Sequence, residues 1–362
     1  MLQSPRVLAL ASAEPRFHFT QEALLREAQA RLLGPAWQHK AAKAQQAAQI
    51  ERLFAATQVH ERRAAVDLLS YYKRVPGTGE RMAVYATEAY TLGKAAADEC
   101  LRRAAGRREP GDVTDVSVVS CTGYGAPGLD ILLARDLALP RDVRRVVIGH
   151  MGCHGALVGL RQALTAVRAQ PEATVLLASV ELASLHFTPT LDPEVLTSYA
   201  LFGDGAAAAL IGAGPEGEGP ELVDAYCAAD FAAAGQMTWT ITDQGFVMGL
   251  SPRVPATLRR SVGGVVEGLL GPHDLRAADI THWIIHPGGP AILEAVKRKL
   301  ELGDEQVAGS WEVLRERGNC SSATVLLILE RLLRSGRTHA GEWGVMMAFG
   351  PGLTLETCLL RF

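Results

Sequence analysis

The sequence has no closely spaced pair of cysteines and no long uncharged apolar run. Its six cysteines are scattered along the chain, as Cys100, Cys121, Cys153, Cys227, Cys320 and Cys358. This spacing argues against a zinc site and against the disulfide framework of a secreted protein. No apolar stretch reaches the roughly 18 residues that a membrane-spanning helix needs. We therefore expect a cytoplasmic protein with no metal ion and no integral membrane segment.

A bias of charge is also missing. The chain has 36 Lys and Arg against 39 Asp and Glu, for a net charge of −3, so its composition suggests no nucleic-acid partner. It also lacks a phosphate loop of the Gly-x-x-x-x-Gly-Lys kind. What it does have is 362 residues, 48% of them hydrophobic. That is enough for a large core in two domains or halves.

Apolar runs of strand length alternate with helical patterns along the chain. The run Val7 to Leu10 after Arg6 imitates a signal peptide, but it is too short and is interpreted as a first strand. Further strands are expected near 114–120, 143–148, 174–180, 204–211, 281–286 and 344–348. Helices are expected at 21–33, 41–57, 81–104, 128–137, 157–168, 256–270, 290–300 and 322–334. The composition of residues 212–220 predicts a loop and the best boundary in the chain.

Two segments of the sequence echo one another. Phe202-Gly203-Asp204-Gly205 and Phe349-Gly350-Pro351-Gly352 each lead into an apolar stretch. Alternating β and α units with matching ends suggest a duplicated α/β fold. We expect halves at 1–215 and 216–362, with the functional site at the seam between them.

Cys153 is the first candidate for chemistry. It lies between the apolar run Val146 to Ile148 and a helical pattern that begins near Leu157, with glycines on both sides. A thiol at a helix N-terminus feels the positive end of the helix dipole, so we expect a lowered pKa. A lone cysteine at such a junction is more often a small buried hydrophobe than a nucleophile.

His286 and Asn319 follow downstream in similarly constrained settings. His286 ends an apolar run and precedes Pro287-Gly288-Gly289-Pro290, while Asn319 lies in Gly318-Asn319-Cys320-Ser321. Alone, His286 could be a hydrogen-bonded core residue, and Asn319 could cap the helix that starts near Ser322. His154 is a poor base for Cys153, because consecutive helical residues diverge. The coincidence of Cys153, His286 and Asn319 suggests an acyl-transfer site.

These motifs give the chain a resemblance to the type III polyketide synthases, the chalcone-synthase-like branch of the thiolase superfamily. The resemblance runs from the Val7 strand to Leu360 and includes the Cys153 turn, Leu201 to Ala207, His286 to Ile292, Gly318 to Ala323 and Phe349 to Thr354. It implies a thiolase-like, duplicated α/β/α/β/α five-layered fold and a homodimer. The substrates it implies are acyl-CoA and malonyl-CoA, with no further cofactor.

The resemblance also assigns roles. Cys153 would carry the acyl group as a thioester. His286 would support the thiolate and, with Asn319, stabilise the enolate left by decarboxylation of malonyl-CoA. The enolate would then attack the thioester, and repeated Claisen condensation would end in cyclisation.

Further positions correspond to substrate contacts in the family. Phe202 matches a gatekeeping aromatic residue, and Met248 falls where plant members have a second one. The remaining positions are Cys121, Ala126, His186, Ser198, Trp239, Ser321, Gly288, Gly289 and, for the CoA phosphates, Arg52. The segment Gly245 to Pro255 is similar to bacterial alkylpyrone and alkylresorcinol synthases, which implies a fatty acyl starter and a pyrone or resorcinol-type product.

Two other functions remain open on the residues alone. A ketoacyl-ACP synthase III also uses Cys, His and Asn, although the surroundings of His286 and Asn319 differ from its pattern. A papain-like hydrolase has the same chain order, but its cysteine motif is absent.

Overall fold

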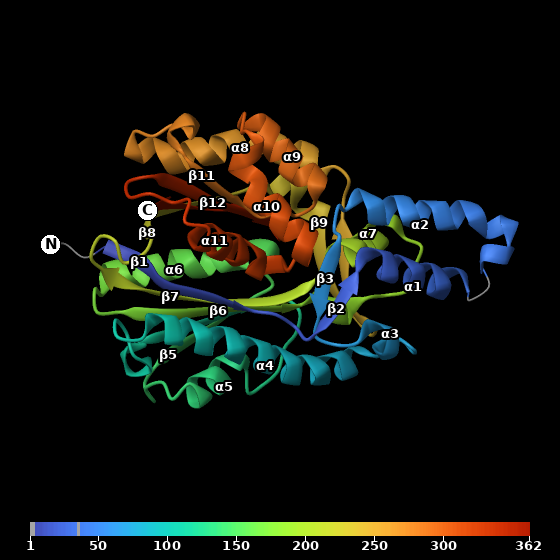
Figure 1. The fold of residues 1–362 in the computed structure, drawn as a ribbon, viewed down its shortest axis with the longest axis horizontal. Coiled ribbons are helices and arrows are strands. Elements are labelled where there is room, and N and C mark those ends of the chain that lie inside the picture. The colour runs from blue at the N-terminus through green and yellow to red at the C-terminus, as the bar shows by residue number, and fades with distance from the viewer. Residues whose placement is uncertain (1–3, 35–36) are drawn as a thin grey trace.

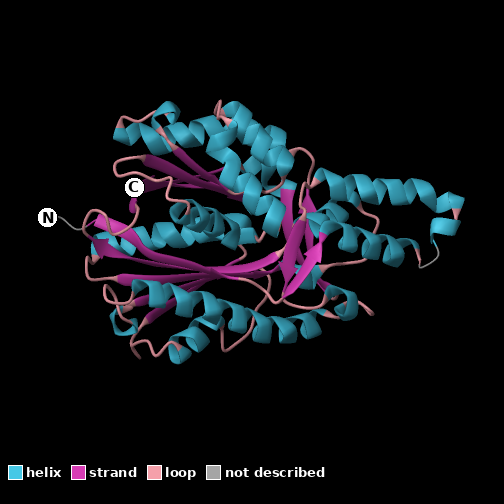
Figure 2. Ribbon diagram, in the orientation of Figure 1, coloured by secondary structure: helices cyan, strands magenta, loops and turns pink. Residues whose placement is uncertain are grey.

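The computed structural model describes residues 4–34 and 37–362, which form a mixed α/β fold (Figures 1 and 2). The strands are β1 Ser4–Ala13, β2 Phe17–Thr20, β3 Glu61–Ala64, β4 Asp115–Ser120, β5 Arg144–Gly149, β6 Thr174–Leu182, β7 Asp204–Gly214, β8 Glu221–Ala229, β9 Met237–Thr242, β10 Gly245–Leu250, β11 His282–Ile285, β12 Trp343–Gly350 and β13 Thr354–Arg361. The α-helices are α1 Gln21–Leu33, α2 Ala44–Ala56, α3 Leu68–Tyr71, α4 Thr78–Ala104, α5 Leu129–Asp136, α6 Gly155–Ala169, α7 Pro193–Leu201, α8 Val254–Leu270, α9 Pro290–Lys299, α10 Asp304–Arg317 and α11 Thr324–Arg334.

Nine strands form one sheet in the order β11-β12-β13-β8-β1-β7-β6-β4-β5. Its two sections meet where β1 pairs with β8, a contact that rests on the single residue pair Arg6 and Glu221. One section, β1 with β4 to β7, comes from the first part of the chain. The other, β8 with β11 to β13, comes from the second part. Between them β7 ends at Gly214 and β8 begins at Glu221, so the predicted loop starts three residues later than expected.

The two sheet sections and the helices form five layers (Figure 1). Helices α4 and α5 cover one outer face, α8 and α9 cover the other, and α6 and α11 lie between the sections. The side chains of β7 alternate between two layers: Ala206 and Ala208 pack toward α4, whereas Ala207 and Ala209 pack toward α6. Because β7 is buried on both faces, small side chains allow helices to approach closely from each side. The predicted fold class is confirmed.

Several elements lie outside the five layers. Helices α1 and α2 project together from one end of the molecule, next to the hairpin-like pair β2 and β3 (Figure 1). The pair β9 and β10 forms a second small sheet, and α7 packs against β10. The short segment after Arg6 is indeed a strand, as expected.

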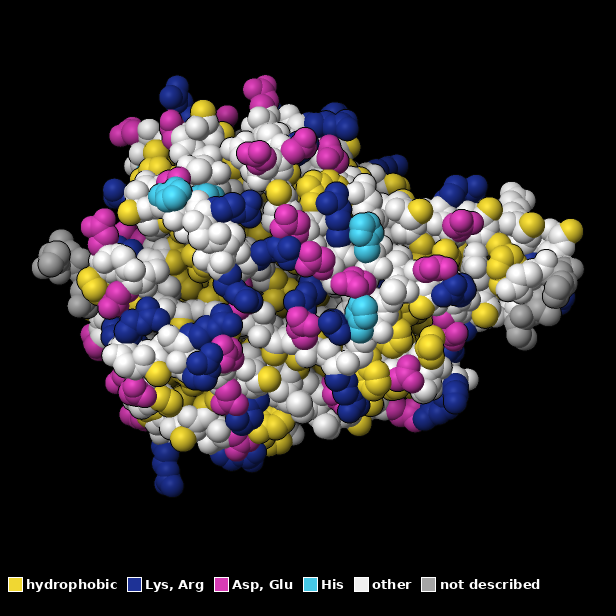
Figure 3. Space-filling view, viewed as in Figure 1, with side chains coloured by type: hydrophobic (Ala, Val, Ile, Leu, Met, Phe, Trp, Pro, Cys, Tyr) yellow, Lys and Arg dark blue, Asp and Glu magenta, His cyan; other side chains and the backbone are white. Residues whose placement is uncertain are grey.

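The face seen in Figure 3 carries interspersed acidic and basic side chains. Among the described residues, no helix combines the length and apolar character that crossing a bilayer requires. In the same part of the chain, no cluster of three or more His, Cys, Asp or Glu side chains is arranged to hold a metal ion.

Candidate active site

Cys153 lies in a tight turn between β5 and α6. The strand ends at Gly149, and residues Gly152–His154 form a single 3-10 turn that runs directly into α6. Gly152 has a φ of 67°, and a Cβ there would lie 2.5 Å from Cδ of Pro351. Only glycine fits both the backbone conformation and the space. The predicted sequence of strand, glycine turn, cysteine and helix is confirmed.

The side chain of Asn319 faces the thiol. Sγ of Cys153 lies 3.9 Å from Oδ1 and 4.0 Å from Nδ2 of Asn319. The backbone N–H of Ser321 donates to Asn319 Oδ1 at 2.8 Å. This bond identifies Oδ1 as the acceptor and leaves the Nδ2 amide group free to donate toward the space at Cys153. Ser321, whose N–H makes this bond, is the first residue of the helical segment formed by Ser321–Ala323 and α11. Asn319 therefore has a structural role as well.

Burial dominates the electrostatics of the thiol. It raises the pKa of Cys153 to about 12, and hydrogen bonds from Ser321 and Asn319 offset only part of that rise. The expectation of a lowered pKa is therefore wrong for the free protein, because desolvation outweighs the helix N-terminus. At neutral pH the side chain is therefore a thiol rather than a thiolate.

His286 follows β11 and is fully buried. Its backbone N–H donates to Met347 O of the neighbouring strand β12 at 2.8 Å, and β12 contacts the turn that carries Cys153. Neither Nδ1 nor Nε2 has a hydrogen-bond partner. Burial, together with the nearby His154, lowers the pKa of His286 to about 3. The ring is thus a neutral imidazole, and neither of its nitrogens is hydrogen-bonded to any of the described residues.

The cysteine, the histidine and the asparagine come from different parts of the fold. Cys153 belongs to the first sheet section, whereas His286 and Asn319 are carried by segments around the second. The turn of Cys153 contacts both β12 and the Ser321–Ala323 turn. This arrangement corresponds to the expected position at the seam.

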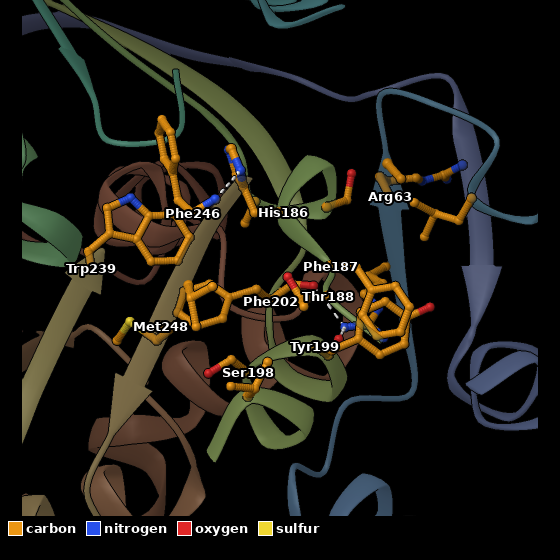
Figure 4. A pocket seen from close by; sticks show the side chains of 17 residues that line it. Arg63, His186, Phe187, Thr188, Ser198, Tyr199, Phe202, Trp239, Phe246 and Met248 are labelled. Atoms are coloured by element: carbon orange, nitrogen blue, oxygen red, sulfur yellow. Dashed lines mark hydrogen bonds between the residues drawn. The ribbon is translucent and has the colours of Figure 1, made fainter. Parts of the chain in front are cut away.

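A cavity lies between α7, β3 and the β9–β10 pair, and none of Cys153, His286 and Asn319 lines it. Its volume is about 40 Å³. Five of the positions proposed from sequence line it: His186, Ser198, Phe202, Trp239 and Met248. Figure 4 shows Phe202 at its centre, with Met248 on one side and Tyr199 and Thr188 on the other. The backbone links one wall of the cavity to Asn319, since Phe202 and Asn319 form a parallel β-bridge.

His186 organises one wall of the cavity. Its ring stacks on Phe246 with a centroid distance of 4.3 Å, and the Phe246 N–H donates to Nδ1 at 3.0 Å (Figure 4). Nδ1 is therefore an acceptor, so Nε2 carries the proton and donates to Thr122 O at 2.6 Å. Burial lowers the pKa of His186 to about 4, which keeps the ring neutral. Trp239 closes the wall by donating from Nε1 to Cys121 O at 2.8 Å.

Cys121 lies behind the catalytic turn rather than in the cavity lining. Its Sγ accepts a hydrogen bond from the Gly152 N–H at 3.0 Å. It thus holds the backbone next to Cys153.

Glu181, near the end of β6, was missed by sequence reasoning. It accepts hydrogen bonds from the Cys121 N–H at 3.0 Å and from Thr122 Oγ1 at 2.9 Å, as well as from the hydroxyl groups of Ser321 and Ser322. Burial raises the pKa of this carboxyl to about 7. The signal was visible, because Glu181 is the one charged residue in an otherwise apolar strand.

Four proposed positions lie elsewhere. Gly288 and Gly289 follow His286 in the loop before α9; a Cβ on Gly288 would lie 3.6 Å from Cδ2 of His286, and one on Gly289 would lie 3.8 Å from Cδ2 of Leu201. Ala126 is exposed on the loop between β4 and α5. Arg52 is exposed on α2 and forms no ion pair with the described residues. The structure brings neither Ala126 nor Arg52 to the cavity.

Comparison with known proteins adds to this geometry. The family model of chalcone and stilbene synthases, N-terminal domain, matches residues 6–215, and that of the C-terminal domain matches residues 226–362. A 1,3,6,8-tetrahydroxynaphthalene synthase from Streptomyces peucetius subsp. caesius is 37% identical over 278 residues, covering 75% of this chain and 74% of its own length. The alpha-pyrone synthesis polyketide synthase-like Pks18 of Mycobacterium tuberculosis is 32% identical over 326 residues, covering 86% and 81%.

A solved structure agrees over the whole chain. PKS-I from the brown alga Ectocarpus siliculosus superposes with a TM-score of 0.90 at 27% identity, covering 100% of this chain and 99% of that one. The family matches also decide against the papain-like hydrolase. The chain belongs to the chalcone and stilbene synthase family and is a type III polyketide synthase, an acyltransferase that forms carbon–carbon bonds by condensation.

Proposed function

We propose that Cys153 is the nucleophile that accepts the starter acyl group. The thiol sulfur attacks the carbonyl carbon of an acyl-CoA, a new carbon–sulfur bond forms, and the bond to the CoA sulfur breaks. The thiol proton passes to His286 and from there to the departing CoA thiolate. A thiol with a pKa raised to about 12 and an imidazole with a pKa lowered to about 3 support a neutral pair that exchanges this proton only during the reaction.

His286 and Asn319 then serve the extender. Loss of carbon dioxide from malonyl-CoA leaves an enolate whose oxygen needs hydrogen-bond donors, and preorganised donors in a buried site stabilise such a charge. The free Nδ2 of Asn319 and the unpartnered ring of His286 are such donors. The observation that carries the proposal is the contact of 3.9 Å between Cys153 Sγ and the Asn319 side chain. This contact supports a pairing of the acyl-carrying thiol with the amide that would stabilise the enolate.

The steps after the first condensation are inferred from the family and from the cavity. We propose repeated extension, followed by cyclisation to a pyrone or resorcinol-type product. The names of the relatives, an alpha-pyrone synthesis enzyme and a tetrahydroxynaphthalene synthase, support an aromatic or pyrone product class. We retain Phe202 and Met248 as gatekeeping residues, Arg52 as a CoA contact, and the division into halves at 1–215 and 216–362 as parts of this proposal.

A homodimer is also proposed. The edge strand β5 exposes Val146 and Val147, 42% and 51% of whose surfaces face solvent, and its outer edge pairs with no other described strand. Tyr124, Ile131 and Met151 extend this apolar surface. Unpaired apolar edge strands are templates for pairing with a second chain. A second copy would cover this edge and lie against the Ala126 loop.

The test is incubation of the purified protein with malonyl-CoA and a series of acyl-CoAs, followed by mass spectrometry of the products. We expect products that differ by acetate-derived units, together with an acyl-enzyme of matching mass. Absence of any condensation product with every starter would overturn the proposed function.

A further inference from the structure

The two residues Cys121 and Thr122, directly after β4, are tied to their surroundings by side chains from β6, from the turn after β6 and from β9. Nε1 of Trp239 on β9 donates to Cys121 O at 2.8 Å. Nε2 of His186, in the 3-10 turn after β6, donates to Thr122 O at 2.6 Å. Glu181 on β6 accepts from the Cys121 N–H and from Thr122 Oγ1. Side chains therefore hold both carbonyls of this buried segment.

The same segment supplies an acceptor to the turn of the nucleophile. Cys121 Sγ accepts a hydrogen bond from the N–H of Gly152, the residue before Cys153. A path of hydrogen bonds and backbone thus runs from the donors of Trp239 and His186 to the catalytic turn. A shift of the segment moves the Cys121 sulfur, and the Gly152 N–H then loses its acceptor or follows it.

The polar atoms of the two rings are fully engaged. His186 donates from Nε2 to Thr122 O, and its Nδ1 accepts from the Phe246 N–H at 3.0 Å. One face of the imidazole stacks on the Phe246 ring, at an interplanar angle of 10° (Figure 4). The indole of Trp239 has a single donor, which Cys121 O accepts. Neither ring keeps a hydrogen-bonding group for a substrate.

We propose that Trp239 and His186 are positioning residues of the acyl-transfer site. They fix the Cys121–Thr122 segment, and the Cys121 sulfur in turn fixes the backbone that presents Cys153. The inference rests on the proposed function, in which Cys153 is the nucleophile, and it replaces the substrate contacts that the sequence resemblance implies for these two residues. Displacement of a nucleophile slows its attack on every starter, because the reacting atoms must be aligned in close contact.

The experiment measures acylation of Cys153 by intact mass, without malonyl-CoA. Acetyl-CoA, hexanoyl-CoA and decanoyl-CoA are each varied in concentration, which separates the maximum rate from the half-saturating concentration. Trp239→Phe keeps an aromatic ring but removes the donor. We expect its maximum rate to fall by roughly 3- to 10-fold, the worth of one hydrogen bond. The factor should be the same for each starter that the native protein loads, with the half-saturating concentration unchanged.

Two amide variants separate the nitrogens of His186. In His186→Gln the amide nitrogen lies near the position of Nε2, so the donor to Thr122 O is kept. In His186→Asn the amide oxygen lies near the position of Nδ1, so only the acceptor for the Phe246 N–H is kept. We expect His186→Gln to stay within about twofold of the native rate and His186→Asn to lose roughly 3- to 10-fold. The reverse order would overturn the assignment of His186.

A double-mutant cycle tests the path through the Cys121 sulfur. Cys121→Ala removes the acceptor of the Gly152 N–H, so adding Trp239→Phe to it should cause little further loss. Losses that multiply would show that Trp239 acts independently of Cys121, and would overturn the proposed path. Cys121→Ser keeps an acceptor and should be acylated faster than Cys121→Ala.

Trp343→Phe is the matched control. Trp343 begins β12, whereas the turn of Cys153 adjoins the other end of that strand, at Gly350. This variant should leave the rates unchanged, and thermal melts check that every variant is folded at the assay temperature.

Unchanged maximum rates in Trp239→Phe and His186→Asn would overturn the inference. So would a loss confined to the longer starters, or a raised half-saturating concentration at a normal maximum rate, because either would show that the two side chains contact the starter. These results differ from failure of the proposed function, in which no starter labels Cys153 of the native protein.

Discussion

At the scale of single residues, the protonated thiol of Cys153 governs how the site responds to pH. Burial raises its pKa to about 12 and lowers that of His286 to about 3, so neither group titrates between pH 5 and 9. A stable thiolate–imidazolium pair would instead titrate within that range. For the neutral pair, the fraction of Cys153 present as thiolate should keep rising as the pH rises toward 9.

We therefore expect the rate of Cys153 alkylation by iodoacetamide to rise about tenfold per pH unit from pH 6 to pH 9, with no plateau. The modified residue is identified by peptide mass spectrometry, with the Cys153→Ala protein as background. A plateau that begins near pH 6 would show that a thiolate is already present, and that burial does not control the group.

Loading and decarboxylation should separate on mutation. Cys153→Ala should abolish acyl loading but retain release of carbon dioxide from malonyl-CoA. Asn319→Ala removes a donor worth roughly 3–4 kcal/mol, so decarboxylation should fall by about two to three orders of magnitude while Cys153 is still acylated. His286→Ala should impair both steps.

Release of labelled carbon dioxide and intact mass of the acyl-enzyme measure the two reactions. Cys227→Ala is the matched control, because Cys227 is an exposed cysteine on β8. Full decarboxylation by Asn319→Ala would contradict the assignment of its amide as the enolate donor.

Glu181 should make stability depend on pH. Its pKa is raised from 4.5 to about 7 by burial, so the folded state holds the proton more tightly than the unfolded state. That stabilisation is fully present below pH 4.5 and is lost as pH rises through 7. The change amounts to about 3 kcal/mol, at 1.36 kcal/mol per pKa unit.

Glu181→Gln removes this titration. Between pH 5 and pH 8 the native protein should therefore lose melting temperature relative to Glu181→Gln, since other titrating groups are common to both. Parallel thermal melts of the two proteins measure it. An identical pH dependence in both would show that the carboxyl does not gain its proton on folding.

Sequence reasoning identified candidate side chains from their local pattern, but not the features that depend on burial in the fold. Cys153, His286 and Asn319 lie in or next to glycine turns, and the first two follow apolar runs, a pattern that is visible in the sequence. Arg62 and Arg63 are neighbours in the sequence, and nothing there shows that Arg62 is buried without an ion pair while Arg63 pairs with Glu14. The pKa of Cys153 was missed for the same reason, because desolvation depends on the whole fold.

At the scale of secondary-structure elements, the turn before α6 sets the position of the thiol. Gly152→Ala forces a φ of 67° on an L-residue and brings Cβ to 2.5 Å from Pro351. The conformation alone costs about 1–2 kcal/mol, and relief of the clash displaces the turn. We expect a lower melting temperature and a loss of acyl loading of at least tenfold.

Gly264→Ala is the matched control, since Gly264 lies within α8 and an added Cβ meets nothing within 4 Å. It should stabilise the helix by about 0.5–1 kcal/mol and leave loading unchanged. Normal loading by Gly152→Ala would mean that this turn tolerates a side chain.

Elements with strong periodicity were predicted well. Helix α1 at Gln21–Leu33 and strand β5 at Arg144–Gly149 agree with expectation to within about a residue at each end. Helices α7 and α10 and strands β8, β9, β10 and β13 were not predicted separately. α10 reads as a polar segment because charged residues occupy both of its ends, at Asp304 and Glu305 and at Arg315 to Arg317. The β9–β10 pair shows no clear alternation of buried and exposed residues. Their positions are set by packing rather than by local pattern.

At the scale of the whole molecule, the exposed edge of β5 predicts association. Val147→Glu places a charge on the proposed dimer surface and should convert the dimer into a monomer at micromolar concentration. Sedimentation velocity measures the change. Ile241→Glu is the control, because Ile241 is similarly exposed at 53% but lies on β9. A native protein that sediments only as a monomer would contradict the proposal.

The bridge between Phe202 and Asn319 has a consequence for how this enzyme can diversify. The Asn319 N–H donates to Leu201 O and the Gly203 N–H donates to Asn319 O, so the end of α7 and the residue proposed as enolate donor share one stretch of paired backbone. A mutation that shifts α7 to enlarge the cavity also shifts Asn319, and new substrate range then comes with slower chemistry. Side chains of the β9–β10 pair reach the same cavity without that bond. Substitutions accepted during divergence should therefore accumulate on β9 and β10 at positions other than Trp239, with α7 held fixed by selection for rate.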